Sequence, residues 1–205
     1  SIGVILNIDS DHLDYFKDVD HITRSFDKFA GLVPENGTII AYDANPFVKS
    51  IVDDIPNAIT FGTADTCDYY AEGIVFNSEG MPRFTVKRGS EVLCEMQLAV
   101  PGEHNVLNAL ASFACCHILG VEPADIAATL ENFTGTQRRF DLMGRTADGI
   151  KIYDDYAHHP TEIKATLSAV KNMKHNKLWC LFQPHTYTRT MALMEEFAEA
   201  FGDAD

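Results

Sequence analysis

The chain has 205 residues, of which 46% are hydrophobic and 22% charged, enough to bury the core of one large domain or two modest ones. Acidic residues outnumber basic ones by 30 to 16, giving a formal net charge of −14, which argues against a nucleic acid as partner because phosphate backbones require clustered Lys and Arg. No apolar run approaches the length of a membrane span, no signal peptide is visible, and five cysteines without a C-x-x-C pair indicate buried free thiols in the cytoplasm.

Residues 1–62 alternate strands with helices, and this order indicates a parallel sheet. The expected strands are residues 1–8, 38–42 and 58–62, and the expected helices are residues 22–32 and 46–55. Because the sequence starts within an apolar strand and stops just after a helix, we expect it to be a fragment of a longer chain.

The pattern changes after this region to alternating apolar and polar residues with short turns at residues 78–80 and 88–90, which predicts an antiparallel meander. The expected strands are residues 69–76, 83–87 and 92–100. An apolar helix then runs to Leu119, where Gly120 ends it, and another helix covers residues 123–133. These elements predict an α/β fold whose mostly parallel sheet carries an antiparallel meander.

Residues 134–140 form a polar, glycine-bearing connector and are the best candidate for a domain boundary. We expect one domain at residues 1–137 and a second at residues 138–205. A new alternation of strands and helices begins in the second domain. Its expected strands are residues 150–154 and 177–182, and its expected helices are residues 162–173 and 191–201.

The decapeptide D-D-Y-A-H-H-P-T-E-I, residues 154–163, follows a run that predicts a buried strand and precedes a helix whose first position suits Pro160. Two carboxylates, a tyrosine and two imidazoles therefore lie at a strand-to-helix switch. Ligands of open α/β sheets bind beyond the carboxyl ends of strands, and helix N-termini attract anions, so we expect a ligand site here. A polar loop before a capped helix is the alternative.

Asp9, Asp11, His12 and Asp14 crowd the end of the first expected strand. Carboxylates and an imidazole suit a divalent ion. A solvated loop with a helix-capping aspartate is the alternative.

His104, Asn105 and Asn108 stand at the start of the apolar helix, with the two asparagines one turn apart on one face. Paired carboxamides can read a purine edge, because each offers a donor and an acceptor. The alternative is that Asn105 caps the helix and Asn108 lies on the surface.

Two cationic segments complete the set. Arg138 and Arg139 lie in the connector, where a guanidinium can fork onto a phosphate as two domains close. An exposed basic pair is the alternative. The segment Q-P-H-x-Y-x-R-T, residues 183–190, repeats the order of strand, polar loop with His and Arg, and helix.

The patterns N-x-x-x-D-H-L-D, G-x-H-N-x-x-N-A, R-R-F, D-D-Y-A-H-H-P-T-E-I and Q-P-H-x-Y-x-R-T, in this order, resemble the Mur ligase family along nearly the whole chain. The resemblance implies a central ATPase domain and a partial Rossmann-like C-terminal domain, with a UDP-binding N-terminal domain in the same longer chain. It implies ATP-dependent amide formation through an acyl phosphate, in cytoplasmic synthesis of peptidoglycan precursors. The last two motifs favour UDP-N-acetylmuramate and L-alanine as the substrates.

The same resemblance assigns residues to the nucleotide. His12 is expected to hold Mg²⁺, and Asn105 and Asn108 are expected to contact the adenine of ATP, with His104 beside them. Arg139 is expected to reach the phosphate or the ribose of the nucleotide.

The second expected domain supplies the remaining assignments. Asp155 and Tyr156 resemble residues at the ribose and the base. His158, His185 and Arg189 match the region that receives the incoming amino acid and the acyl phosphate.

Two departures from the family pattern matter. The P-loop pattern G-x-x-x-x-G-K-[ST] is absent from this sequence, and we expect it before residue 1, together with a Mg²⁺-binding glutamate. Thr186 stands where many relatives have arginine, so binding of the substrate carboxylate is expected to rest on Arg189 or His185.

Three other functions compete with this interpretation. A sibling enzyme that attaches a recycled peptide to the same sugar acid shares D-D-x-A-H-H-P but is expected to differ at residues 183–190. A non-catalytic nucleotide- or sugar-binding module would never have carried a P-loop. A metal hydrolase would need His12, His158 and His159 around one ion, and their positions in two expected domains disfavour it.

Overall fold

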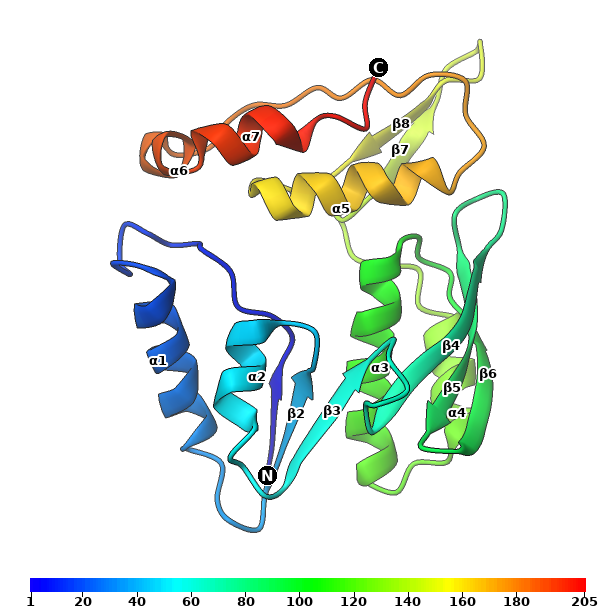
Figure 1. Ribbon diagram of the computed structural model, residues 1–205. Coiled ribbons are helices and arrows are strands. Elements are labelled where there is room, and N and C mark those ends of the chain that lie inside the picture. The colour runs from blue at the N-terminus through cyan, green and yellow to red at the C-terminus, as the bar shows by residue number, and fades with distance from the viewer.

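The computed structural model describes residues 1–205 and contains one sheet of six strands and one of two strands (Figure 1). The six-stranded sheet follows chain order: β1 (Ile2–Ile5), β2 (Thr38–Tyr42), β3 (Ala58–Gly62), β4 (Tyr69–Phe76), β5 (Pro82–Arg88) and β6 (Glu91–Gln97). Its helices are α1 (Val19–Ala30), α2 (Pro46–Val52), α3 (Glu103–Ile118) and α4 (Pro123–Glu131). Strands β1 to β4 pair in parallel and β4 to β6 pair antiparallel, which confirms the predicted sheet with its meander.

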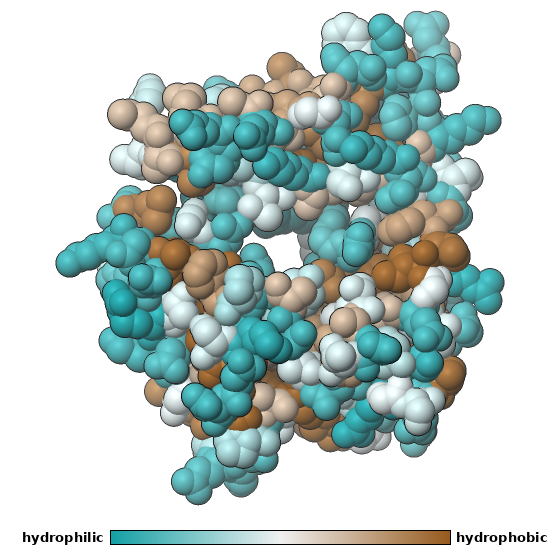
Figure 2. All heavy atoms as spheres, in the orientation of Figure 1, coloured by the Kyte–Doolittle hydropathy of each residue, from teal (hydrophilic) through white to brown (hydrophobic).

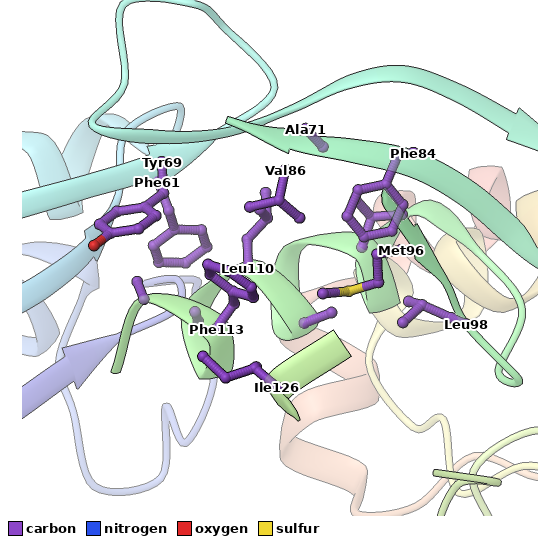
Figure 3. Packing of buried hydrophobic residues seen from close by; sticks show 14 of the residues in the cluster. Phe61, Tyr69, Ala71, Phe84, Val86, Met96, Leu98, Leu110, Phe113 and Ile126 are labelled. Carbon is purple, nitrogen blue, oxygen red and sulfur yellow. The ribbon is translucent and has the colours of Figure 1, made fainter. Parts of the chain in front are cut away.

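The six-stranded sheet is buried on both faces by helices. Along β2, Ile39 and Ala41 belong to one apolar cluster with residues of α1 and α2, whereas Ile40 belongs to the other cluster with α3. This division follows from the alternation of side chains along a strand. In the second cluster, Leu110 and Phe113 of α3 are fully buried against the strands (Figure 3).

The C-terminal part of the chain holds the hairpin of β7 (Asp141–Arg145) and β8 (Lys151–Asp154), followed by α5 (Pro160–Lys171), α6 (Tyr187–Ala192) and α7 (Met194–Ala200). Residues of α5 and α7 form its apolar cluster, with Leu193 between α6 and α7. The predicted burial of residues 150–154 is wrong, because β8 pairs only with β7 and Ile152 is 51% exposed.

The predicted strand at residues 177–182 is also wrong. This segment is strand-like in composition but lies unpaired, because no neighbouring strand offers it backbone partners. Trp179 and Leu181 are consequently exposed. The predicted helix at residues 191–201 begins earlier, at Tyr187, and is interrupted at Leu193.

All five cysteines are unpaired. Only Cys67 is fully buried, and burial raises the pKa of its thiol to about 11, so this group stays a neutral thiol. The prediction of burial is wrong for Cys180, which is exposed on the unpaired segment. No helix combines the length and the apolar character that crossing a bilayer requires.

Helix α5 belongs to the C-terminal part of the molecule. Both of its ends contact the first part, which holds the six-stranded sheet. Near its N-terminus, Thr161 Oγ1 donates a hydrogen bond to Asp9 at 2.6 Å. Near its C-terminus, Met173 forms a β-bridge with Glu79, and Gly80 lies against the same Met173 side chain. The helix has 12 residues and is therefore about 18 Å long. It holds the C-terminal part above the sheet, and Figure 2 shows an opening between the two.

The N-terminus of α5 is closed by a capping box. His159 is the N-cap and accepts from the Thr161 backbone, while the Glu162 side chain accepts from the backbone N–H groups of His158 and His159. Burial raises the pKa of Glu162, but the hydrogen bond from His158 and the charges of His158 and Arg139 outweigh burial and hold the pKa below its ordinary value of 4.5.

This cap predicts a pH-dependent loss of stability. Because the pKa of Glu162 is lower in the folded state, its stabilisation is present above pH 4.5 and is lost as the pH falls through the folded-state value. Glu162→Gln should lower the free energy of unfolding by about 1 kcal/mol at pH 7, and by less in acid. Thermal melts of both proteins between pH 3 and pH 7 measure the difference, and a constant difference would contradict the assignment.

The unpaired segment predicts self-association of the 205-residue chain. Trp179 is 85% and Leu181 102% exposed, and an exposed, extended apolar segment can pair with a strand of another molecule. Leu181→Lys should shift the chain towards the monomer in sedimentation velocity runs. The matched change Leu32→Lys, at another exposed leucine outside the segment, should leave the distribution as it was. Equal effects of the two substitutions would count against a role for the segment.

Candidate active site between the two parts

A cavity of about 450 Å³ lies between the loop after β1 and the C-terminal part. The first part contributes Ser10, Asp11, His12, Leu13 and Asp14; the second contributes Tyr156, His158, His185, Thr186, Thr188, Arg189 and Leu193. Five predicted site residues therefore surround one space, although they come from three segments far apart in the sequence. They are His12, Tyr156, His158, His185 and Arg189.

Backbone strain concentrates in the predicted motifs. The four non-glycine residues with positive φ are His12, Arg138, Phe140 and Thr186. Left-handed conformations cost energy for residues with a Cβ, and for β-branched threonine the cost is highest. Such conformations persist where surrounding contacts hold them and are frequent at functional sites. Thr186, with φ of 68°, thereby turns the chain into α6 at the edge of the cavity.

An ion pair closes one side of this cavity. Arg189 Nε and Nη2 lie 3.0 and 2.8 Å from Asp11 Oδ1, and the Arg189 side chain is only 14% exposed. Burial raises the pKa of Asp11, but the hydrogen bonds from the His12 backbone and from Arg189 outweigh burial and lower it overall. Asp11 is therefore a carboxylate at neutral pH.

The two histidines of the decapeptide have different roles. His159 is 6% exposed; its Nδ1 accepts from the Thr161 N–H at 3.3 Å and its Nε2 lies 3.0 Å from the Ser10 carbonyl. These partners assign the proton to Nε2 and make His159 a docking residue between the two parts. His158 Nδ1 lies 2.8 Å from the Tyr156 carbonyl and must donate to it. The Nε2 lone pair of neutral His158 is thus free to accept.

The connector arginines lie against Tyr156. The guanidinium carbons of Arg138 and Arg139 are 4.8 and 5.8 Å from the centre of its ring. Arg138 also pairs with Asp154 at 3.3 Å, and Arg139 with Glu162 at 3.3 Å. Cation–π contact and ion pairing together fix the connector onto the decapeptide.

Asp155 organises the backbone around the decapeptide. Its carboxylate accepts from the N–H groups of Phe140 and Ala157, at 3.1 and 2.8 Å, and from Thr166 Oγ1 at 3.0 Å. Three donors from the connector, the loop and α5 therefore converge on one side chain. Any hydroxyl of a ligand would have to share this carboxylate with them.

The predicted adenine residues lie at the N-terminus of α3, outside the cavity lining. Asn105 donates to the Pro101 carbonyl at 2.7 Å, and Asn108 donates to Asn105 Oδ1 at 3.4 Å, so the two carboxamides form one chain of hydrogen bonds. Partial withdrawal from water lowers the pKa of His104; nearby Asp155 raises it and Arg139 lowers it. Arg139 of the connector and Asp155 of the decapeptide therefore lie close enough to the N-terminus of α3 to influence the pKa of His104.

Several residues make contacts that the sequence did not predict: Asp9 and Asp11 were expected beside His12 at a divalent ion, and Thr161 and Glu162 only as members of a ligand-site segment. Asp9, Asp11 and Thr161 make the contacts between the two parts, and Glu162 makes the cap. The order D-x-D-H shows carboxylates but not their partners, which lie about 150 or more residues away. The T-E pair after His-Pro was a readable signal, but its cap is histidine instead of the usual Ser, Thr, Asp or Asn.

No group of three or more His, Cys, Asp or Glu side chains is arranged to hold a metal ion. His12, with a side chain 69% exposed, has only Asp11 beside it, at 3.7 Å from Nε2 to Oδ2. The protein thus offers one imidazole and one carboxylate that Arg189 already engages.

Two family profiles match the chain. The Mur ligase middle domain matches residues 1–116, and the Mur ligase glutamate ligase domain matches residues 138–205. The UDP-N-acetylmuramate–L-alanine ligases of Acetivibrio thermocellus and Clostridium tetani are 50% and 49% identical in sequence to this chain. Both alignments cover 100% of this chain and 44% of the relative, so the chain spans less than half the length of these proteins.

Solved structures show the same likeness. The UDP-N-acetylmuramate–alanine ligase MurC of Thermotoga maritima superposes with a TM-score of 0.77 at 30% identity, over 100% of this chain and 44% of that one. A murein peptide ligase of Psychrobacter arcticus superposes with a TM-score of 0.66 at 28% identity, over 100% and 42%. With both profiles in the expected order and relatives identical at half of their aligned positions, the chain belongs to the Mur ligase family.

Proposed function

We propose that the chain is the part of a UDP-N-acetylmuramate–L-alanine ligase that binds ATP and the incoming amino acid. The observation that carries the proposal is identity of 45 to 50% to ligases of that name over the whole chain. Residues 1–137 would form the ATP-binding domain and residues 138–205 the ligase domain. The reaction would serve peptidoglycan synthesis in the cytoplasm, with UDP-N-acetylmuramate bound mainly by parts of the longer protein outside these residues.

The nucleotide would lie against the N-terminus of α3 and the connector. Asn105 and Asn108 would contact adenine through the outer donors and acceptors of their hydrogen-bonded chain. Arg139 would reach the ribose or phosphate after leaving Glu162, and Tyr156 would offer its ring to the base. Asp155 would contact the ribose while it holds the connector, with His104 close by.

His12 would be a ligand of Mg²⁺. One exposed imidazole does not hold this ion by itself, and Mg²⁺ in nucleotide sites is typically bound by one or two protein groups, phosphates and water. The residues present fit an ion of that kind and do not fit a metal site built by this chain alone. Bound there, Mg²⁺ would neutralise charge on the phosphates and the acyl oxygen.

The acyl phosphate and the amine would meet at the cavity. His158 Nε2 is free to accept, so this imidazole can take a proton from the ammonium group of L-alanine and leave the neutral amine that attacks the acyl carbon and displaces phosphate. Arg189 and His185 would hold the amino-acid carboxylate and the phosphate oxygens. Most of the catalysis would come from placing the two reactants and stabilising charge.

The full-length protein tests this proposal directly. It should release ADP only when ATP, Mg²⁺, UDP-N-acetylmuramate and L-alanine are all present, as a coupled assay measures. ADP release with a murein tripeptide in place of L-alanine would instead identify the sibling ligase. No ADP release with either substrate would support a non-catalytic binding module. The 205-residue chain alone should release none, because it has no P-loop lysine.

The adenine assignment predicts a selective effect. Asn108→Ala removes an exposed carboxamide and should raise KM for ATP about tenfold, the loss expected for one or two hydrogen bonds. KM for L-alanine should stay within about twofold. Asn132→Ala, an exposed asparagine at the end of α4, is the matched control. Unchanged kinetics with ATP would remove the assignment.

A further inference from the structure

Arg189 is attached to the first part of the molecule through a single oxygen. Both Nε and Nη2 point to Asp11 Oδ1, at 3.0 and 2.8 Å. A guanidinium has five N–H groups, so three remain without a protein partner in this arrangement. Because Arg189 lines the cavity, these donors can serve an anion there.

Helix α6, which carries Arg189, has little else to hold it. The helix has six residues, none of them buried, and no side chain caps its N-terminus. Its N-cap residue Thr186 has a strained conformation, and its first residue, Tyr187, is 92% exposed. Without the pair to Asp11, the short helix would lack the contact that directs Arg189 inward.

Asp11, in contrast, belongs to a well-anchored loop. Asn45, which caps α2, donates its side-chain amide to the Ile8 carbonyl at 2.9 Å just before this loop. His159 contacts the carbonyl of Ser10 at 3.0 Å, and the His12 N–H donates to Asp11 Oδ1 at 2.7 Å. The loop around Asp11 is therefore held by contacts other than the pair to Arg189, and the His12 N–H orients the carboxylate.

We propose that Asp11 is a positioning residue that holds the Arg189 guanidinium in the cavity and makes the amino-acid site depend on contact between the two parts. This inference rests on the proposed ligase function for the identity of the anion, the carboxylate of L-alanine. Asp11 itself touches no substrate. It acts by presenting the remaining N–H groups of Arg189, which only a closed arrangement of the two parts allows.

The same carboxylate links two ends of the site. Its Oδ1 accepts from the backbone of His12, the proposed metal ligand, and from Arg189, the proposed carboxylate ligand. A change at the nucleotide end that moves this loop would therefore move Arg189 as well.

The first experiment needs no substrate. Hydrogen–deuterium exchange of the ligand-free, full-length protein should show α6 amides exchanging several-fold faster in Asp11→Asn than in wild type. Asp65→Asn removes the same charge from an exposed loop away from the cavity and should leave α6 unchanged. Equal exchange of α6 in wild type and Asp11→Asn would overturn the proposal.

The second experiment separates positioning from a general structural effect. Asp11→Asn should raise KM for L-alanine roughly tenfold, as expected for a charge-assisted contact, and leave KM for ATP within about twofold. In the Arg189→Gln background, Asp11→Asn should add nothing further to KM for L-alanine. Additive effects, or equal increases in both KM values, would overturn the assignment of Asp11.

The two proposals fail in different ways. A wild-type protein that releases no ADP with L-alanine would refute the proposed function and the identity of the anion. The hydrogen–deuterium exchange rates of the α6 amides in wild type and Asp11→Asn would still decide whether Asp11 holds Arg189.

Discussion

The arrangement of the site depends on the attachment of α5 at both ends. Its N-terminus is tied to the loop after β1 by Thr161 and His159, and its C-terminus is tied to the turn before β5 at Glu79 and Gly80. A helix is stiff along its axis, so two anchors fix the separation of the two parts, and the Arg189–Asp11 pair adds a third contact away from this axis. The cavity exists because His158 and Arg189 are brought opposite His12 by this geometry.

Much of the fold was readable from the sequence, because local rules decide it. Alternating strands and helices gave the parallel sheet, and period-2 runs gave the meander. The strand expected at residues 177–182 failed for a physical reason: a strand needs a neighbour to pair with, and an apolar run cannot show whether one is present. Ile152 is exposed for another reason: β8 pairs with β7, but nothing in this two-stranded sheet covers the Ile152 side chain fully.

The site was readable as a set of residues but not as a set of contacts. Order and residue type located His12, His158, His185 and Arg189, which share one cavity. They could not show that Asp11 engages Arg189, since 178 positions separate the two and only the folded chain brings them together. Nor could they show that His159 is occupied at both ring nitrogens while His158 keeps one free.

The unpaired segment that follows α5 has an optical consequence. Trp179 is the only tryptophan of the chain and stands almost fully in water. Its indole emission should therefore lie at long wavelength and move to shorter wavelength whenever a strand or another surface covers the segment. The chain thus carries a built-in fluorophore on the exposed segment at residues 177–182.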